Sequence, residues 1–253
     1  MNDVNPHKPR KLIGKLFVFY LITLLLTPIL GVGQEFLKIS YDRIAIPQMA
    51  PALAFVITTI LFPSLKTRLN FQFDKHVFLR LWQAIFIPFG LIVICYFGCG
   101  LIDLTFEPTT NLITALPLSI GGMVFGSMGE EIGWRGFLQP SLEKKYAKFP
   151  TALLVGFFWG LWHMGNYQYG WVFMAGFLLF TMSASILLRI VLHGTNNHMV
   201  LSILFHLSIN LGFYIFFKNA LTEATMIVAN GIVWAFAAFV LWMTSKKKQR
   251  GLV

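Results

Sequence analysis

Charged residues are scarce in this chain. Asp, Glu, Lys and Arg together make up 12% of its 253 residues, about half of the roughly 25% that is usual in a soluble domain. Acidic residues are rarer than basic ones, with 10 Asp and Glu against 20 Lys and Arg. A chain that is 57% hydrophobic and so poor in charge lacks the side chains that cover a water-facing surface. The composition therefore argues against a soluble domain and for a membrane protein.

Cysteine is nearly absent as well. The two cysteines, Cys95 and Cys99, lie four residues apart in one apolar run. Neither a disulfide framework nor a cysteine metal site can be built from this pair. We interpret both as polarizable apolar side chains that fill a core.

Long apolar runs are what the chain has in abundance. About 20 apolar residues cross the hydrocarbon core of a bilayer as a helix, and the alternating pattern of a membrane β-barrel is missing. The sequence therefore predicts an all-α fold, a polytopic transmembrane helical bundle in a single membrane domain over residues 1–253. About eight helices are expected, near residues 16–33, 44–62, 78–101, 112–138, 150–167, 171–192, 198–217 and 224–243.

The positions of the basic residues predict an orientation. If eight helices alternate from a cytoplasmic N-terminus, the outer segments hold Lys38, Arg43 and Lys218, and the inner segments hold the other 17 of the 20 basic residues. The ten acidic residues divide five and five, as a positive-inside bias requires. We predict a multi-pass protein of the cell membrane with both termini cytoplasmic. The net charge of +10 then reflects contact with the lipid bilayer, and no nucleic acid is expected as a partner.

Glycine is spaced for close helix packing in two segments. Gly122 and Gly126 lie four residues apart, as do Gly156 and Gly160. This spacing lets helix backbones approach closely inside a membrane. Both pairs precede the most polar residues of their segments, so close packing and polar chemistry are expected at the same place.

The run GEEIGWR, residues 129–135, places three ionisable side chains in an apolar segment. Such a group costs roughly 2.5–3.5 kcal/mol to insert into a membrane, so its presence there indicates a functional site by default. Glu131 and Arg135 are one helical turn apart, acid first, and are expected to neutralise each other. Glu130 points about 100° away from that face and has no such partner in the nearby sequence. Glu130 is therefore the carboxylate expected to be free for chemistry.

Two more apolar segments each carry a histidine one helical turn from an aromatic or amide side chain. Trp159 precedes His163 by four residues, and His206 precedes Asn210 by four. At about 1.5 Å rise per residue, Glu130 and both histidines come out at similar depth, roughly 12–21 Å from the inner surface. We expect one polar site, shared by three helices and reached from the cytoplasmic side. Three other histidines fall at predicted cytoplasmic helix ends and are expected at the surface or at the membrane interface: His76, His193 and His198.

Two chemistries fit one glutamate and two histidines. The carboxylate and one imidazole can deprotonate a water, while the other imidazole and Asn210 stabilise the oxyanion that forms at a carbonyl. Alternatively, Glu130, His163 and His206 can ligate a catalytic zinc with one position open. The expected cofactor is accordingly none or a zinc ion. The chain lacks the HExxH pair of zinc proteases and the GxSxG turn of serine hydrolases.

The motifs EExxxR, aromatic-xxx-His and HxxxN on successive apolar segments resemble the CAAX protease and bacteriocin-processing (CPBP) family, also called Abi. That family includes the Ras-converting-type CAAX prenyl endopeptidases. The resemblance covers residues 112–217, and EEIGWRGFLQP is its most specific part. It implies a CPBP/Abi-like catalytic core over those residues, of a kind described both as a metalloprotease and as a glutamate-dependent protease.

Carried over by position, the resemblance implies four catalytic roles. Glu130 activates a water together with His163. His206 and Asn210 polarise the scissile carbonyl. These assignments agree with the first of the two chemistries that the residues suggest.

The resemblance also implies three supporting residues. Glu131 and Arg135 support the site from the same helix. The aromatic position is usually Phe in the family and is Trp159 in this chain. We expect Trp159 to act as a packing ring, without effect on the chemistry.

Three functions compete on the sequence. The favoured one is an intramembrane endopeptidase that hydrolyses a peptide bond of a peptide or membrane-protein substrate near the cytoplasmic half of the membrane. The alternative is a non-catalytic membrane peptide-binding or bacteriocin self-immunity protein that uses the same cavity. A transporter is least favoured, because neither an inverted repeat nor paired broken helices are visible.

Overall fold

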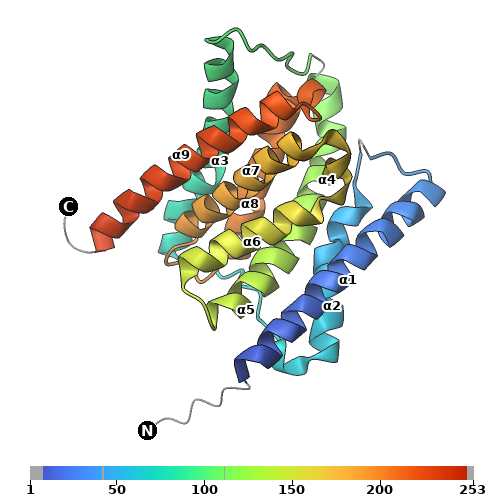
Figure 1. Cartoon of the computed structure of the whole chain (residues 1–253), viewed down its shortest axis with the longest axis vertical. Coiled ribbons are helices and arrows are strands. Elements are labelled where there is room, and N and C mark those ends of the chain that lie inside the picture. The colour runs from blue at the N-terminus through green and yellow to red at the C-terminus, as the bar shows by residue number, and fades with distance from the viewer. Residues whose placement is uncertain (1–7, 42, 111, 250–253) are drawn as a thin grey trace.

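The computed structural model describes residues 8–41, 43–110 and 112–249, which form a bundle of helices (Figure 1). Within these residues the β-structure amounts to one isolated bridge, between Asn70 and His198. The predicted all-α fold is confirmed. The α-helices are α1 Lys8–Phe36, α2 Ala50–Leu61, α3 Lys75–Gly100, α4 Leu112–Gly133, α5 Gln139–Glu143, α6 Lys148–Trp162, α7 Trp171–Val191, α8 Met199–Phe216 and α9 Ala224–Gln249.

Five of the described helices, α1, α3, α7, α8 and α9, are long and apolar enough to cross a membrane. The chain is therefore a multi-pass helical membrane protein. Each of the eight predicted segments contains a helix, but α2 has only 12 residues and α6 only 15. At about 1.5 Å per residue, 15 residues reach about 22 Å, less than the roughly 30 Å hydrocarbon core. These two segments are shorter than expected because part of each is 3₁₀ helix, at Ile46–Met49 and Met164–Tyr169.

The predicted helix over 112–138 contains a change of helix type. α4 ends at Gly133, a π-helical turn follows at Trp134–Leu138, and α5 continues the path to Glu143. The turn is anchored from outside, because the Thr67 hydroxyl donates to the Gly136 carbonyl oxygen at 2.8 Å. Such π-turns frequently occur at functional sites. This one directly follows the predicted carboxylates.

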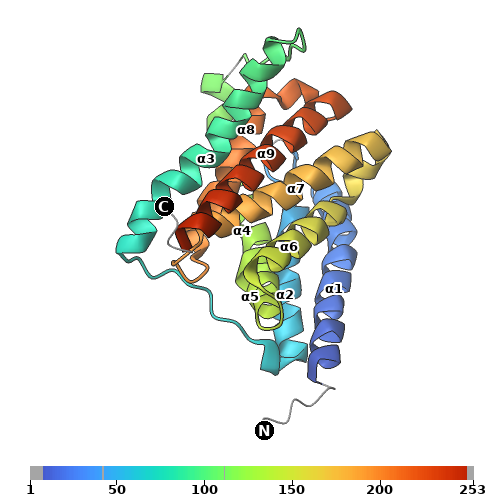
Figure 2. The same ribbon diagram turned by 60° about the vertical axis from the view of Figure 1, so that its left-hand side comes forward.

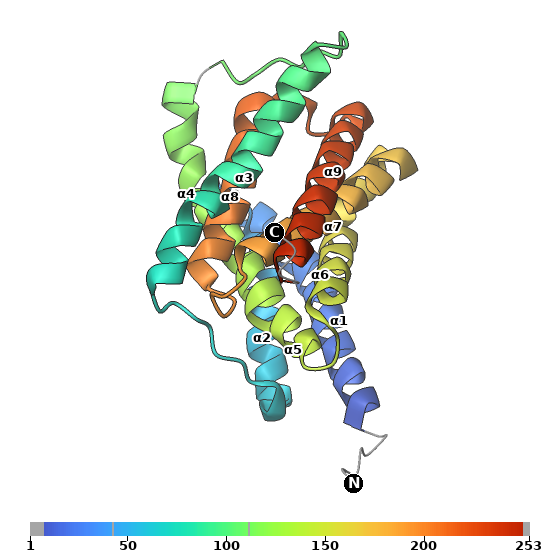
Figure 3. The same ribbon diagram turned by 90° about the vertical axis from the view of Figure 1, so that its left-hand side faces the viewer.

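Helix α4 joins two groups of helices. On one flank α1 lies beside α2, and on the other α7 lies beside α9 (Figures 1 and 2). Figure 3 shows α3 beside α8, and α4 contacts both α2 and α8. The motif-bearing part of α4 is therefore surrounded by protein rather than by lipid.

The glycines of α4 face the segment that leads into α2. A Cβ at Gly129 would lie 2.6 Å from Met49 Sδ and 2.7 Å from the Gln48 carbonyl oxygen. At Gly126 a Cβ would collide with the Gln48 side chain, and at Gly122 with the Arg43 carbonyl oxygen. The predicted close approach at the first glycine pair is thus confirmed, and its partners are the 3₁₀ turn before α2 and the residues that lead into that turn.

The second glycine pair packs α6 against α7. A Cβ at Gly156 would lie 2.6 Å from Met182 Cα and 2.7 Å from the Thr181 carbonyl oxygen. A Cβ at Gly160 would lie 2.5 Å from Thr181 Oγ1. This prediction is confirmed too, and the close contact fixes the helix that carries Trp159 and ends before His163.

Two of the minor expectations are decided by burial. Cys95 and Cys99 are buried and unbonded, as expected of core side chains. The expectation that His198 lies at the surface is wrong, because its side chain is 0% exposed. The extended segment before α3 crosses over it, and the rings of Phe73 and His198 lie 4.9 Å apart.

The loops gather at two ends of the bundle. At one end Lys15 Nζ donates to Ser64 Oγ at 3.0 Å, joining the start of α1 to the turn after α2. At the other end the Thr109 N–H donates to the Ile215 carbonyl oxygen at 2.9 Å, joining the segment before α4 to the end of α8. The first end gathers the loops that the positive-inside bias assigns to the cytoplasm. The orientation of the termini stays a prediction.

Cysteine labelling tests that orientation. Asn219 and Lys144 are exposed at the two opposite ends, and both native cysteines are buried. We expect a membrane-impermeant maleimide to label Asn219→Cys in intact cells and to label Lys144→Cys only after the membrane is opened. The reverse pattern would contradict the predicted orientation.

Candidate active site

Glu130 lies at the centre of a buried polar cluster. It stands near the end of α4 and is 0% exposed. Its Oε1 accepts a hydrogen bond from Gln48 Nε2 at 2.9 Å, and its Oε2 accepts one from Trp159 Nε1 at 2.6 Å. Hydrogen bonds to an ionised carboxylate are short and strong. The expectation of an unengaged carboxylate is therefore corrected, since two donors from two other elements hold Glu130 in place.

Gln48 belongs to this cluster, although the sequence motifs do not include it. It lies in the 3₁₀ turn Ile46–Met49, 82 residues before Glu130. The glycine at position 126 leaves the space through which its side chain reaches the carboxylate. The sequence does single Gln48 out, because it is the one amide side chain in the apolar run near residues 44–62.

Glu131 has two partners rather than one. Arg135 Nη1 lies 2.8 Å from Glu131 Oε1, and both side chains are 1% exposed. The predicted pair is therefore present. His206 Nδ1 lies 2.9 Å from the same oxygen, so Glu131 connects the arginine of the π-turn to the histidine of α8.

His206 stands between the two carboxylates. Its Nδ1 bonds Glu131, and its Nε2 lies 4.0 Å from Glu130 Oε2. Glu130, Glu131, Arg135 and His206 thus form one buried network, so the pairing extends over four side chains instead of the two that the sequence predicts.

His163 ends the helix that carries Trp159. It is the C-cap of α6, and its Nδ1 lies 2.8 Å from the Trp159 carbonyl oxygen. Because a carbonyl oxygen only accepts hydrogen bonds, the proton of a neutral His163 resides on Nδ1 and its Nε2 is the acceptor. The imidazole is close enough to Glu130 and His206 to interact with both electrostatically. The structure thus brings together the residues of all three sequence motifs.

Trp159 contacts three members of the cluster. The guanidinium of Arg135 lies 4.7 Å from its ring centroid, and the rings of Trp159 and His206 lie 5.2 Å apart. Its indole N–H also donates to Glu130. The expectation that Trp159 is only a packing ring is wrong, because a phenylalanine at this position has no donor for the carboxylate.

The change Trp159→Phe tests this contact. A hydrogen bond to a charged group contributes about 1.5–3 kcal/mol, so we expect the activity of the site to fall roughly tenfold or more while the ring packing is kept. Trp162→Phe is the matched control, because the Trp162 indole N–H donates to Thr27 Oγ1 at 2.7 Å, away from Glu130. Equal activity loss in the two variants would contradict a role for the Trp159 donor.

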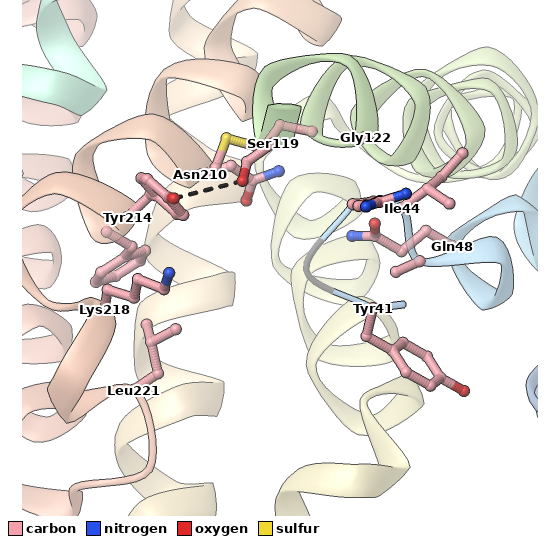
Figure 4. A pocket seen from close by; sticks show the side chains of 13 residues that line it. Tyr41, Ile44, Gln48, Ser119, Gly122, Asn210, Tyr214, Lys218 and Leu221 are labelled. Atoms are coloured by element: carbon pink, nitrogen blue, oxygen red, sulfur yellow. Dashed lines mark hydrogen bonds between the residues drawn. The ribbon is translucent and has the colours of Figure 1, made fainter. Parts of the chain in front are cut away.

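A cavity of 310 Å³ adjoins the cluster. Gln48 and Asn210 line it from opposite walls (Figure 4), and Arg43 and Lys218 line it as well. Asn210 Nδ2 donates one hydrogen bond to Ser127 Oγ at 3.2 Å, and an amide carries two N–H donors. A molecule in this cavity therefore meets residues of the cluster directly.

The fit of a zinc ion can be judged from the same contacts. Both oxygens of Glu130 accept hydrogen bonds, and His206 Nε2 lies 4.0 Å from the nearer one. Two atoms that share one zinc at about 2.0–2.1 Å in tetrahedral geometry lie closer, at roughly 3.4 Å. Within the described ranges, no group of three or more His, Cys, Asp or Glu side chains is arranged to hold a metal ion. Glu130, His163 and His206 in this arrangement do not fit the predicted zinc site.

Part of the chain is similar to a known family. Residues 111–212 match the family described as Type II CAAX prenyl endopeptidase Rce1-like. The matched segment runs from α4 into α8 and contains every residue of the cluster except Gln48.

Individual relatives extend the match beyond that segment. The chain is 26% identical to CAAX prenyl protease 2 of Methanococcus maripaludis over 90% of its own length and 94% of the relative. It is also 26% identical to lysostaphin resistance protein A of Staphylococcus haemolyticus, over 77% of its own length and 55% of the relative. The protein of the same name from Staphylococcus aureus is 25% identical over 88% of this chain and 54% of the relative. The chain therefore spans about half the length of the staphylococcal relatives and nearly all of the archaeal one.

Proposed function

We propose that this protein is an intramembrane endopeptidase with Glu130 as its general base. The observation that carries the proposal is the placement of this buried carboxylate, with both oxygens bonded to donors and the Nε2 of His206 4.0 Å away. The similarity of residues 111–212 to a family described as prenyl endopeptidase supports the same reaction class. The name of the archaeal relative, CAAX prenyl protease 2, agrees with it.

The proposed reaction begins with a water between Glu130 and the imidazoles. Glu130, assisted by His163, takes a proton from the water, and the hydroxide adds to the scissile carbonyl carbon. The oxyanion accepts hydrogen bonds from the second N–H of Asn210 and from Nε2–H of protonated His206. Collapse of the tetrahedral intermediate breaks the C–N bond, and Glu130 returns the proton to the leaving amine. Arg135 and Glu131 keep His206 charged and oriented.

We further propose that the peptide reaches Glu130 through the cavity between Gln48 and Asn210 (Figure 4). Its lining includes Arg43 and Lys218, two of the three basic residues that the charge bias assigns to the outer side. Entry through this cavity and the predicted cytoplasmic access therefore disagree under the predicted orientation. The labelling of Asn219→Cys and Lys144→Cys tests that orientation.

A second candidate function is non-catalytic peptide binding or bacteriocin self-immunity that uses the same cavity. The observation that favours it is the name of the staphylococcal relatives, lysostaphin resistance protein A. In that case the cluster would bind a peptide and release it unchanged. Such a function is expected to survive Glu130→Gln, which keeps the shape of the side chain, whereas the endopeptidase is not.

Comparative proteomics of membranes tests the endopeptidase proposal without a known substrate. Membranes from cells with the wild-type chain are compared with membranes from cells that express Glu130→Ala at equal level. We expect at least one membrane protein whose C-terminal fragment appears only with the wild type. Identical fragment patterns, with both proteins correctly folded, would overturn the proposal.

A further inference from the structure

A second cavity, of 690 Å³, lies away from the Glu130 cluster. Its walls come from the first turns of α3 and α6 and from the last turns of α7 and α9, which lie in the lower half of the molecule in Figure 2. Ala152 of α6 lines it, 11 residues before His163, or about 16 Å along the helix. It is therefore a separate site at the end predicted to be cytoplasmic.

The polar part of this cavity is basic. Arg80, Lys148 and Arg189 line it together with His193. Arg189 Nε lies 3.0 Å from Glu143 Oε1, so one of the three cations already has an acidic partner. Burial, together with the charges of Arg189, Lys148 and Arg80, lowers the pKa of the His193 imidazole, as expected where positive charge gathers. The cavity thus keeps an excess of positive charge.

The rest of the cavity is apolar. Phe149 and Trp242 stack at 4.5 Å between ring centroids, and both rings line the wall. Ile186, Ile190 and Leu241 line it from α7 and α9. A cavity lined by both apolar side chains and cations matches a molecule with an acidic head and a hydrocarbon tail.

The depth of the cavity agrees with such a molecule. Lys148 begins α6, Arg189 stands two residues before the end of α7, and the apolar span of α9 ends at Ser245. The cations therefore lie where the helices leave the hydrocarbon, at the level of lipid headgroups. Basic pockets between membrane helices at this level are suited to anionic headgroups.

We propose that the cavity between α3, α6, α7 and α9 is a binding site for one anionic phospholipid. Its phosphate is held by Arg80 and Lys148, and its acyl chain lies against Phe149 and Trp242. Arg189, held by Glu143, borders the headgroup. The inference does not rest on the proposed endopeptidase activity, because it concerns residues outside the Glu130 cluster.

Native mass spectrometry of the full-length protein in detergent measures this binding directly. The probes are dioleoylphosphatidylglycerol, dioleoylphosphatidylcholine and inorganic phosphate. We expect the phosphatidylglycerol to bind more tightly than the phosphatidylcholine, and Arg80→Gln/Lys148→Gln to weaken the phosphatidylglycerol roughly tenfold or more. The double variant Lys144→Gln/Lys145→Gln removes the same charge from exposed residues of the same end and is expected to change binding less than about twofold.

Two results would overturn the proposal. One is that the Arg80→Gln/Lys148→Gln protein binds phosphatidylglycerol as tightly as the control protein Lys144→Gln/Lys145→Gln does. The other is inorganic phosphate that displaces phosphatidylglycerol at equal concentration, because the site would then recognise the free anion rather than a lipid. Circular dichroism of both double variants confirms that each is folded, so that lost binding reports on the site.

Discussion

Replacing Glu130 with glutamine is expected to lower peptide cleavage by a factor of about 10²–10⁴, the usual contribution of a general base. The glutamine amide cannot take a proton from water at neutral pH, whereas its size and shape match the glutamate. The measurement is the rate of cleavage, by the purified protein in detergent, of a substrate that the membrane proteomics identifies. Glu223→Gln is the control, because Glu223 is exposed and lies in the turn before α9.

The hydrogen bonds around Glu130 explain why this variant is expected to fold. Trp159 donates to one oxygen and Gln48 to the other. A glutamine at position 130 can keep its oxygen toward the indole and turn its NH₂ toward Gln48. The Gln48 amide can flip to present its own oxygen, since an amide has a donor and an acceptor end. Full cleavage activity of a folded Glu130→Gln protein would exclude Glu130 as the base and leave the binding or resistance function.

The sequence predicted those members of the Glu130 cluster that lie on one helix or belong to one of the three sequence motifs. Glu131 and Arg135 are one turn apart on one segment, and their ion pair is present at 2.8 Å. The glycine pairs predicted close approach at the right places, because a missing Cβ acts locally. Helix spacing and depth also predicted that Glu130 and His206 would meet, although helix tilt could not be known.

Contacts that depend on loop conformation could not be predicted in this way. Gln48 reaches Glu130 because a 3₁₀ turn brings it against the glycine face of α4, and nothing in the spacing of the two residues, 82 apart, encodes that approach. The indole N–H of Trp159 was visible in the sequence, but its direction depends on the side-chain rotamer. The π-turn at Trp134–Leu138 likewise follows from packing rather than from residue pattern.

The change Arg135→Met is expected to have the largest effect on stability. Arg135 and Glu131 are both buried, so the variant leaves a buried carboxylate with only His206 as a partner. Removing one member of a buried ion pair typically costs about 3–5 kcal/mol. At roughly 2–4 °C per kcal/mol for a chain of this size, the Tm of the purified protein in detergent should fall by about 10 °C. Arg189→Met is the control, because its pair with Glu143 is partly exposed, at 11% and 17%.

A second substitution separates the charge of Glu131 from the packing of Arg135. In Glu131→Gln/Arg135→Met neither charge is left, so the penalty of the unpaired carboxylate disappears and much of the lost Tm should return. Activity should not return with it, because His206 then loses the carboxylate that binds its Nδ1 at 2.9 Å. A double variant as unstable as Arg135→Met would show that the guanidinium stabilises the fold by its packing on Trp159, where it lies 4.7 Å from the ring centroid. Recovery of stability without activity would show that the ion pair serves to hold His206 beside Glu130.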